Sequence, residues 1–90
     1  MKDEPKLIVS KKSQPISSGG KTVYAEIYRL ENEKRWVLAI DDEFSNTSIL
    51  DNTFKSEKAA LLEAKKIILG EGINNFIGPE DGKGEWVKST

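Results

Sequence analysis

The 90-residue sequence contains no cysteine and no histidine. Without cysteine, the chain forms no disulfide, no thiolate metal site and no cysteine nucleophile. Without histidine, it lacks the base of Ser-His-Asp and Cys-His catalysis, a common zinc ligand, and the usual proton shuttle near neutral pH. We therefore predict that the protein is not an enzyme and that it has no catalytic residue, no metal site and no cofactor.

Long apolar runs and a surplus of one charge are missing as well. The first apolar run, Leu7–Val9, is too short for the core of a signal peptide, and no run approaches the roughly 20 residues that cross a bilayer. Lys and Arg total 14 against 15 Asp and Glu, so a net charge of −1 gives no global attraction toward nucleic acids or anionic membranes. We expect a cytoplasmic protein without a membrane partner.

What the chain does contain is material for one small domain. The hydrophobic content of 37% is enough for a modest core, and the length fits a single domain over residues 1–90. Residues 1–6 are charged and contain Pro5, so we predict a flexible arm there. Residues 78–84 are rich in Gly, Pro and Asp, which favours a mobile loop.

The clearest secondary-structure signal is an amphipathic helix from Ser56 to Leu69. Ser56 is a favourable N-cap residue, and Glu57 places a negative charge at the positive end of the helix dipole. Gly70 or Gly72 can end the helix. At about 100° per residue, one face carries an apolar stripe suited to a core. This stripe consists of Ala60, Leu61, Ala64, Ile67 and Ile68.

Three strands are expected before the helix, over residues 22–30, 35–41 and 47–54. Apolar and polar residues alternate in the first strand, whereas the second is apolar on both faces, as is typical of a central strand. The polar residues 31–34 between them have the length of a hairpin connection. In the first strand Val23, Ala25 and Ile27 point to one face, and Tyr24, Glu26 and Tyr28 point to the other.

The remaining segments contribute less to the predicted fold. Residues 10–21 contain Pro15 and end in Gly19-Gly20, so we interpret them as a loop closed by a turn. Leu7–Val9 and residues 85–88 can each add a short strand. The predicted fold class is α+β: an antiparallel three-stranded meander, extended to four or five strands by these segments, with one main amphipathic helix on one face (βββα).

Two short patterns resemble ligand-binding loops without completing them. Gly20-Lys21-Thr22 looks like the end of a phosphate-binding loop, but Pro15 stands where that motif needs its first glycine, and a strand follows. We predict a plain turn with an exposed lysine. Asp41, Glu43 and Ser45 have the spacing of a calcium loop, but Asn46 and Asn52 replace its glycine and its bidentate glutamate, which favours a solvated acidic turn.

Carboxylates are the remaining candidates for catalysis, since acid–base chemistry can use two of them fixed across a cleft. Four acids lie in or beside the predicted strands, but no spacing selects a pair among them. These acids are Glu26, Asp41, Asp42 and Asp51.

The aromatic residues of the first strand suggest a binding surface. Tyr24 and Tyr28 lie on the face opposite the helix, with Lys34 and Arg35 in the following hairpin, and such a face can stack nucleic-acid bases. The other interpretation is that the tyrosines are half-buried under a terminal segment. The nearly balanced charge and the interleaved glutamates disfavour nucleic acid.

The helix carries a second apolar line, Leu62 and Leu69, away from the core stripe and among lysines. We expect these leucines to contact either the C-terminal segment, which contains Ile73, Phe76, Ile77 and Trp86, or another chain, with a slight preference for the intramolecular contact.

Together these features predict a small non-catalytic interaction or regulatory module that binds another protein or self-associates, for example as a homodimer. The alternative is a nucleic-acid-binding domain that uses Tyr24, Tyr28, Lys34 and Arg35. The candidate interaction residues are Tyr24, Tyr28, Lys34, Arg35, Leu62 and Leu69.

Overall fold

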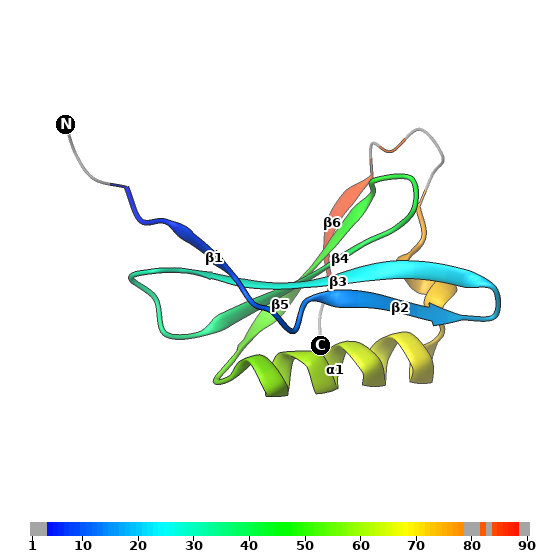
Figure 1. The fold of residues 1–90 in the computed structure, drawn as a ribbon. Coiled ribbons are helices and arrows are strands. Elements are labelled where there is room, and N and C mark those ends of the chain that lie inside the picture. The colour runs from blue at the N-terminus through cyan, green and yellow to red at the C-terminus, as the bar shows by residue number, and fades with distance from the viewer. Residues whose placement is uncertain (1–3, 79–81, 83, 89–90) are drawn as a thin grey trace.

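The computed structural model describes residues 4–78, 82 and 84–88, the last four of them as backbone (Figure 1). In this part of the chain, six strands form one sheet and a single long helix follows the fifth strand. The strands are β1 (Leu7–Val9), β2 (Gln14–Ser18), β3 (Lys21–Leu30), β4 (Trp36–Asp41), β5 (Thr47–Phe54) and β6 (Glu85–Lys88). The helices are α1 (Glu57–Glu71) and a short 3-10 helix, η1 (Ile73–Phe76).

The sheet has the order β1-β3-β4-β5-β6, and β2 pairs with β3 on the same side as β1. All pairings among β1 to β5 are antiparallel, and β6 joins β5 in parallel at the other edge. The predicted α+β meander with one helix on one face is therefore confirmed. Strands form at both terminal segments where the sequence allowed them, Leu7–Val9 and residues 85–88.

The interpretation of residues 10–21 as a loop was wrong, because β2 forms there and pairs with the first half of β3. Gly19 and Gly20, with φ of 58° and 80°, make a two-residue hairpin turn in which both central residues need positive φ. The strand was not predicted because Pro15 lies within it. A proline is tolerated in β2 because this strand lies at the edge of the sheet, where not every N–H is needed for pairing.

Between β1 and β2 the edge is interrupted opposite Ile27. The Ser10 N–H donates to the Ile27 carbonyl at 2.7 Å, and the Ile27 N–H donates to Ser13 Oγ at 2.9 Å, so side-chain and main-chain groups together replace the regular ladder. The buried Ser10 hydroxyl also donates to the Glu57 carboxylate in the first turn of α1. The interruption thereby ties the edge of the sheet to the start of the helix.

The core lies between the sheet and α1, which runs below β2 and β3 in Figure 1 and contacts β2, β3, β4 and β5. As predicted, the Ser56 hydroxyl caps the helix, accepting from the Ala59 N–H at 3.1 Å, and the helix ends at Gly72. The core cluster consists of Ile16, Val23, Ala25, Ile27, Trp36, Leu38, Ile40, Leu50, Ala60, Ala64, Ile67, Ile68, Ile73 and Phe76, with Leu61 packed partly against it. This side of the sheet is called the helix face below, and the opposite side the outer face.

Candidate interaction surface

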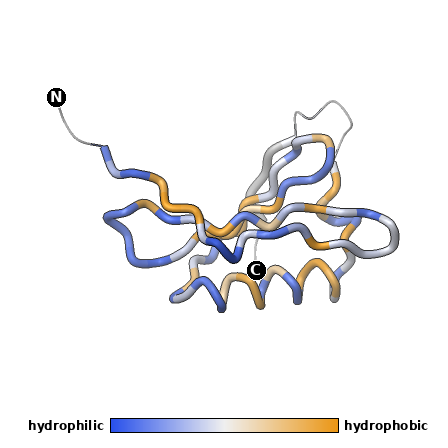
Figure 2. Tube along the Cα trace, viewed as in Figure 1, coloured by the Kyte–Doolittle hydropathy of each residue, from blue (hydrophilic) through white to orange (hydrophobic). Residues whose placement is uncertain are grey.

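Apolar side chains gather on the outer face where β1 meets the end of β3. The strand register pairs Leu7 with Leu30 and Val9 with Tyr28, and Tyr28 in turn with Val37 of β4, so these five side chains are neighbours on one face. Leu7, Val9 and Leu30 are 56%, 47% and 38% exposed, while Tyr28 and Val37 are half-buried. Figure 2 shows β1 as an apolar segment between hydrophilic neighbours. We call these five residues the β1 patch.

This patch differs from ordinary exposed hydrophobic residues because its members are contiguous. Single apolar side chains on a surface are common and need no explanation, whereas large contiguous patches are typical of interaction sites. The sequence indicated Tyr28 but missed Leu7, Val9 and Leu30. The alternation along β3 places Leu30 with the tyrosines, but only the pairing of β1 with β3 brings Leu7 and Val9 beside it.

The two predicted tyrosines share the outer face but lie in different surroundings. Tyr24 is 41% exposed and is paired with Asp41 of β4, while Tyr28 is half-buried. Burial raises the pKa of the Tyr28 hydroxyl, and the nearby carboxylates of Glu26 and Asp41 raise it further. Two carboxylates therefore lie near the Tyr28 hydroxyl on the outer face.

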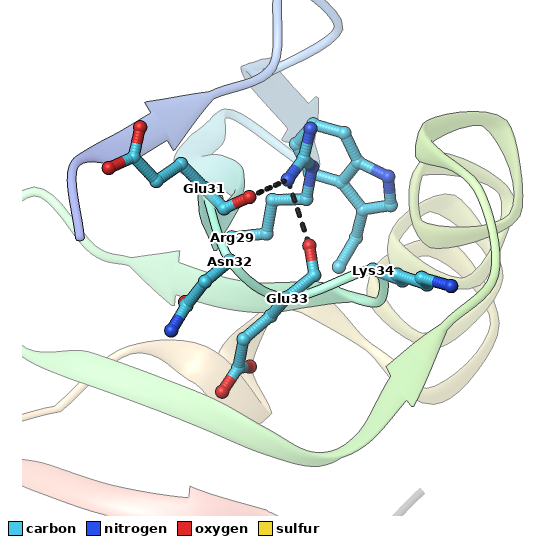
Figure 3. Close-up of a pocket in the computed structure, with 6 residues that line it drawn as sticks. Arg29, Glu31, Asn32, Glu33 and Lys34 are labelled. Atoms are coloured by element: carbon cyan, nitrogen blue, oxygen red, sulfur yellow. Dashed lines mark hydrogen bonds between the residues drawn. The ribbon is translucent and has the colours of Figure 1, made fainter.

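The two predicted basic residues do not join the tyrosines in one cationic cluster. Arg35 is held by Thr53 of β5, since its Nε donates to the Thr53 hydroxyl at 2.6 Å and its Nη2 to the Thr53 carbonyl at 2.8 Å. Lys34 is exposed in the hairpin, and its ammonium group points away from Arg29 in Figure 3. The structure thus places one of the two cations in a structural contact and leaves the other in solvent.

Arg29 has a structural role that the sequence did not reveal. Its guanidinium lies 5.0 Å from the centre of the Trp36 ring, and one of its nitrogens donates to the carbonyl oxygens of Leu30, Glu31 and Glu33 at 2.8–3.4 Å. The carboxylates of Glu31 and Glu33 point away from it (Figure 3). An open hollow of about 400 Å³ surrounds this contact, lined by Arg29, Glu31, Asn32, Glu33, Lys34 and Trp36. Because the Arg29 guanidinium is occupied by the carbonyls of the loop, its role in this hollow is to hold the β3–β4 hairpin loop in place.

The described residues show no cover over the second apolar line of the helix, for which the sequence favoured a contact with the C-terminal segment. Leu62 and Leu69 are 59% and 55% exposed. The C-terminal segment follows a different course, because Ile73 and Phe76 are buried in the core cluster. The side chain of Trp86 lies outside the described residues. The two leucines therefore remain open on the helix surface.

The carboxylate of Asp42, which is 7% exposed, accepts four hydrogen bonds. One oxygen accepts from the N–H groups of Phe44 and Asn46 at 2.9 and 2.8 Å, and the other from the Asn46 side chain and the Gly78 N–H at 2.8 and 2.6 Å. The buried Asn46 side chain in turn accepts from the Gly84 N–H at 2.6 Å. Asp42 and Asn46 thus fasten the β4–β5 turn to two segments that lie far along the chain.

Asp42 continues the two-residue alternation of the core residues of β4. This alternation is the sequence signal that could have identified Asp42 as a buried residue. Burial alone would raise the pKa of its carboxyl, but the hydrogen bonds from Gly78, Asn46 and Phe44 outweigh burial and lower that pKa. A carboxylate that is fully hydrogen-bonded and held ionised has no free oxygen for acid–base work. Its surroundings are those of a structural group.

The other predicted acids do not assemble into a site. Asp41 lies on the outer face and accepts a hydrogen bond from the Thr47 hydroxyl at 2.6 Å, while Asp51 and Glu43 are exposed. Ser45, the third residue of the calcium-like pattern, turns the chain with a φ of 72°. Among the described residues, no group of three or more acidic side chains is placed to hold a metal ion.

The lowered pKa of Asp42 predicts the acid dependence of stability. Since the folded-state pKa lies below its ordinary value of 3.8, the unfolded chain binds this proton more tightly than the folded one. The stability that the carboxylate contributes is therefore fully present above the unfolded-state pKa and is lost as the pH falls through the folded-state pKa. We expect the free energy of unfolding, from urea titrations between about pH 6 and about pH 2.5, to fall less steeply for Asp42→Asn than for the wild type. Parallel curves for the two proteins would contradict this assignment.

The chain matches no protein-family model, no curated protein and no solved structure. No helix in the described residues combines the length and the apolar composition that a membrane crossing requires.

Proposed function

We propose that this protein is a non-catalytic interaction module that binds another protein, or a second copy of itself, through the β1 patch. The observation that supports the proposal best is the contiguity of Leu7, Val9 and Leu30, all exposed, beside the half-buried Tyr28 and Val37. Burying such a patch against a partner removes apolar surface from water, which is the main favourable term in protein association.

The helix surface is the weaker candidate for the same role. Leu62 and Leu69 are about as exposed as Leu7 of the β1 patch, but three exposed lysines of α1 lie around them. Desolvating lysines is costly, and lysine is depleted in the cores of protein interfaces. These lysines are Lys58, Lys65 and Lys66.

Nucleic-acid binding is the second candidate, and the exposed ring of Tyr24 on the outer face favours it. Three observations stand against it. The carboxylates of Glu26 and Asp41 lie near Tyr28 on this face, Arg35 is engaged by Thr53, and the net charge of the chain is −1. A protein partner therefore fits the described surface better than a phosphate backbone does.

The proposal is tested by a pair of matched variants. In Leu7→Lys/Leu30→Lys two exposed leucines of the patch become lysines, and in Leu62→Lys/Leu69→Lys the same change is made at two exposed leucines of the helix. All four positions are solvent-exposed, so both variants should keep their stability within about 0.5 kcal/mol. We expect partner binding or self-association, measured by quantitative co-precipitation and by sedimentation, to weaken at least about tenfold in the patch variant only.

Two results would overturn the proposal. One is equal binding by the wild type and both variants. The other is a salt-sensitive mobility shift with single-stranded DNA or RNA that is lost in Tyr24→Ser and kept in the patch variant, which would establish the nucleic-acid alternative.

A further inference from the structure

We infer that the exposed side of α1 is a second binding surface, and that it binds an acidic amphipathic helix of a partner protein. The surface consists of Leu62 and Leu69 with the lysines Lys58, Lys65 and Lys66, and is called the helix ridge below. It faces away from the sheet, below α1 in Figure 1, whereas the β1 patch lies on the outer face of the sheet. The two surfaces are therefore separate, and a partner on one leaves the other open.

The helix ridge is a continuous line of side chains. Leu62 and Leu69 are 59% and 55% exposed and lie one heptad apart. At about 100° per residue, all five ridge residues fall within about 100° of the helix circumference, opposite the side that packs on the sheet. Each lysine lies three or four positions from a leucine, so their side chains are neighbours on the helix surface.

The charge of the helix ridge has one sign. The acids of α1 are Glu57, Glu63 and Glu71, and each lies about 100° or more around the helix from the nearer ridge leucine. Glu57 also accepts a hydrogen bond from the Ser10 hydroxyl. In the part of the chain that the structure describes, none of the three ridge lysines is held in an ion pair. The helix ridge therefore offers three ammonium groups beside two leucines.

The spacing and the charge together define the partner. A helix that packs along α1 contacts it at intervals of about a heptad, so its apolar side chains meet Leu62 and Leu69. Carboxylates beside that apolar seam then meet the ridge lysines, as flanking charges do in coiled coils. From Lys58 to Leu69 the ridge is about 17 Å long, which corresponds to about three turns of a partner helix.

The lysines that disfavour a neutral apolar partner favour an acidic one, because pairing with carboxylates offsets their desolvation. They disfavour a second copy as well, since two helix ridges in contact would oppose lysine to lysine. An anionic bilayer also attracts lysines, but it binds a helix through a wide apolar face. In α1 that wide face is buried in the core, and only two leucines remain outside it.

The test uses two synthetic helical peptides of about three heptads, labelled and titrated with the full chain by fluorescence anisotropy at low salt. Both carry leucine at positions a and d, and they differ only in having glutamate or lysine at positions e and g. We expect the acidic peptide to bind with a dissociation constant on the order of 10 to 100 µM, because the interface is small. The basic peptide should bind at least about tenfold more weakly.

Reversing the charge of the helix ridge should reverse this preference. In Lys58→Glu/Lys65→Glu the acidic peptide should bind at least about tenfold more weakly than to the wild type, and the basic peptide more tightly. A folding defect cannot produce this gain. The matched control is Lys21→Glu/Lys34→Glu, which makes the same change of net charge at two exposed lysines outside α1. It should change the affinity for the acidic peptide by less than about threefold.

Leu62→Ala/Leu69→Ala tests the apolar part of the helix ridge and should weaken binding of the acidic peptide about fivefold. Unchanged binding in this variant would show plain charge attraction and overturn the inference. It is equally overturned if the wild type does not distinguish the two peptides, or if both charge variants lose affinity alike. Binding to vesicles in which about a third of the lipid is phosphatidylserine, without binding to the acidic peptide, would identify a lipid surface instead. None of these variants changes the β1 patch, so each outcome leaves the proposed function as it stands.

Discussion

Replacing Asp42 with alanine is expected to lower the free energy of unfolding by about 3 to 5 kcal/mol. The carboxylate is 7% exposed and accepts four hydrogen bonds, from the N–H groups of Phe44, Asn46 and Gly78 and from the side chain of Asn46. Its removal takes this acceptor away from four donors, the two of Asn46 in buried surroundings and the N–H groups of Phe44 and Gly78 in half-buried ones. An unsatisfied buried donor costs about 1 to 3 kcal/mol, so several of them together destabilise a small domain severely.

Urea denaturation at neutral pH measures this effect. Asp51→Ala is the matched control, because it removes the same side chain from an exposed position of β5 and should change stability by less than about 0.5 kcal/mol. Asp42→Asn adds a second comparison, since the amide keeps one acceptor oxygen but turns a donor toward the remaining N–H groups. A loss below about 1 kcal/mol in Asp42→Ala would show that water replaces the carboxylate and that the four bonds do not hold the turn.

Replacing Gly82 with alanine is expected to lower stability by about 2 to 3 kcal/mol. A Cβ atom built at Gly82 would overlap the carbonyl oxygen of Phe44. In addition, the backbone φ of Gly82 is +71°, a value that residues with a Cβ rarely adopt. The obstacle is backbone, which cannot rotate away as a flexible side chain can. Gly82 must therefore move away from the β4–β5 turn that Asp42 and Asn46 organise.

Gly70→Ala is the control for this substitution and should have the opposite sign. Gly70 lies within α1, and no atom lies within 4 Å of the Cβ position. Alanine there should stabilise the helix by about 0.5 to 1 kcal/mol, because glycine loses more conformational entropy on folding. Thermal denaturation of both variants measures the difference, and a Gly82→Ala protein as stable as the wild type would mean that the turn tolerates the displaced segment.

The segments that sequence reasoning located correctly are those whose structure is set by nearby residues. The helix follows from Ser56, from the apolar stripe and from Gly72, all within one short stretch of sequence. The alternation in β3 likewise predicted which of its residues share a face, whereas the two apolar faces of β4 did not show which of them meets the helix. β2 was missed because its only buried residue is Ile16, so an edge strand with a proline lacks the pattern that identifies a strand.

The candidate surface was predictable only in part. Tyr24 and Tyr28 were placed on the correct face because alternation along one strand is a local property. For Leu62 and Leu69, the described part of the C-terminal segment does not supply the favoured contact, since Ile73 and Phe76 lie in the core, and the side chain of Trp86 lies outside the described residues. Local periodicity identifies a side chain that is away from the core, but it does not show whether another segment reaches it.

The sequence by itself therefore determined the helix with its core stripe, the three central strands, the alternation of side chains along β3 and the absence of cysteine and histidine. Only the tertiary structure decided that β1 lies beside the end of β3, which makes one patch of Leu7, Val9 and Leu30. It also decided that Asp42, among several neighbouring acids, accepts hydrogen bonds from Gly78 and is linked through Asn46 to Gly84. The physical reason is the range of the interactions: capping and periodicity act within a few residues, whereas strand pairing and buried hydrogen bonds join residues that are distant in sequence.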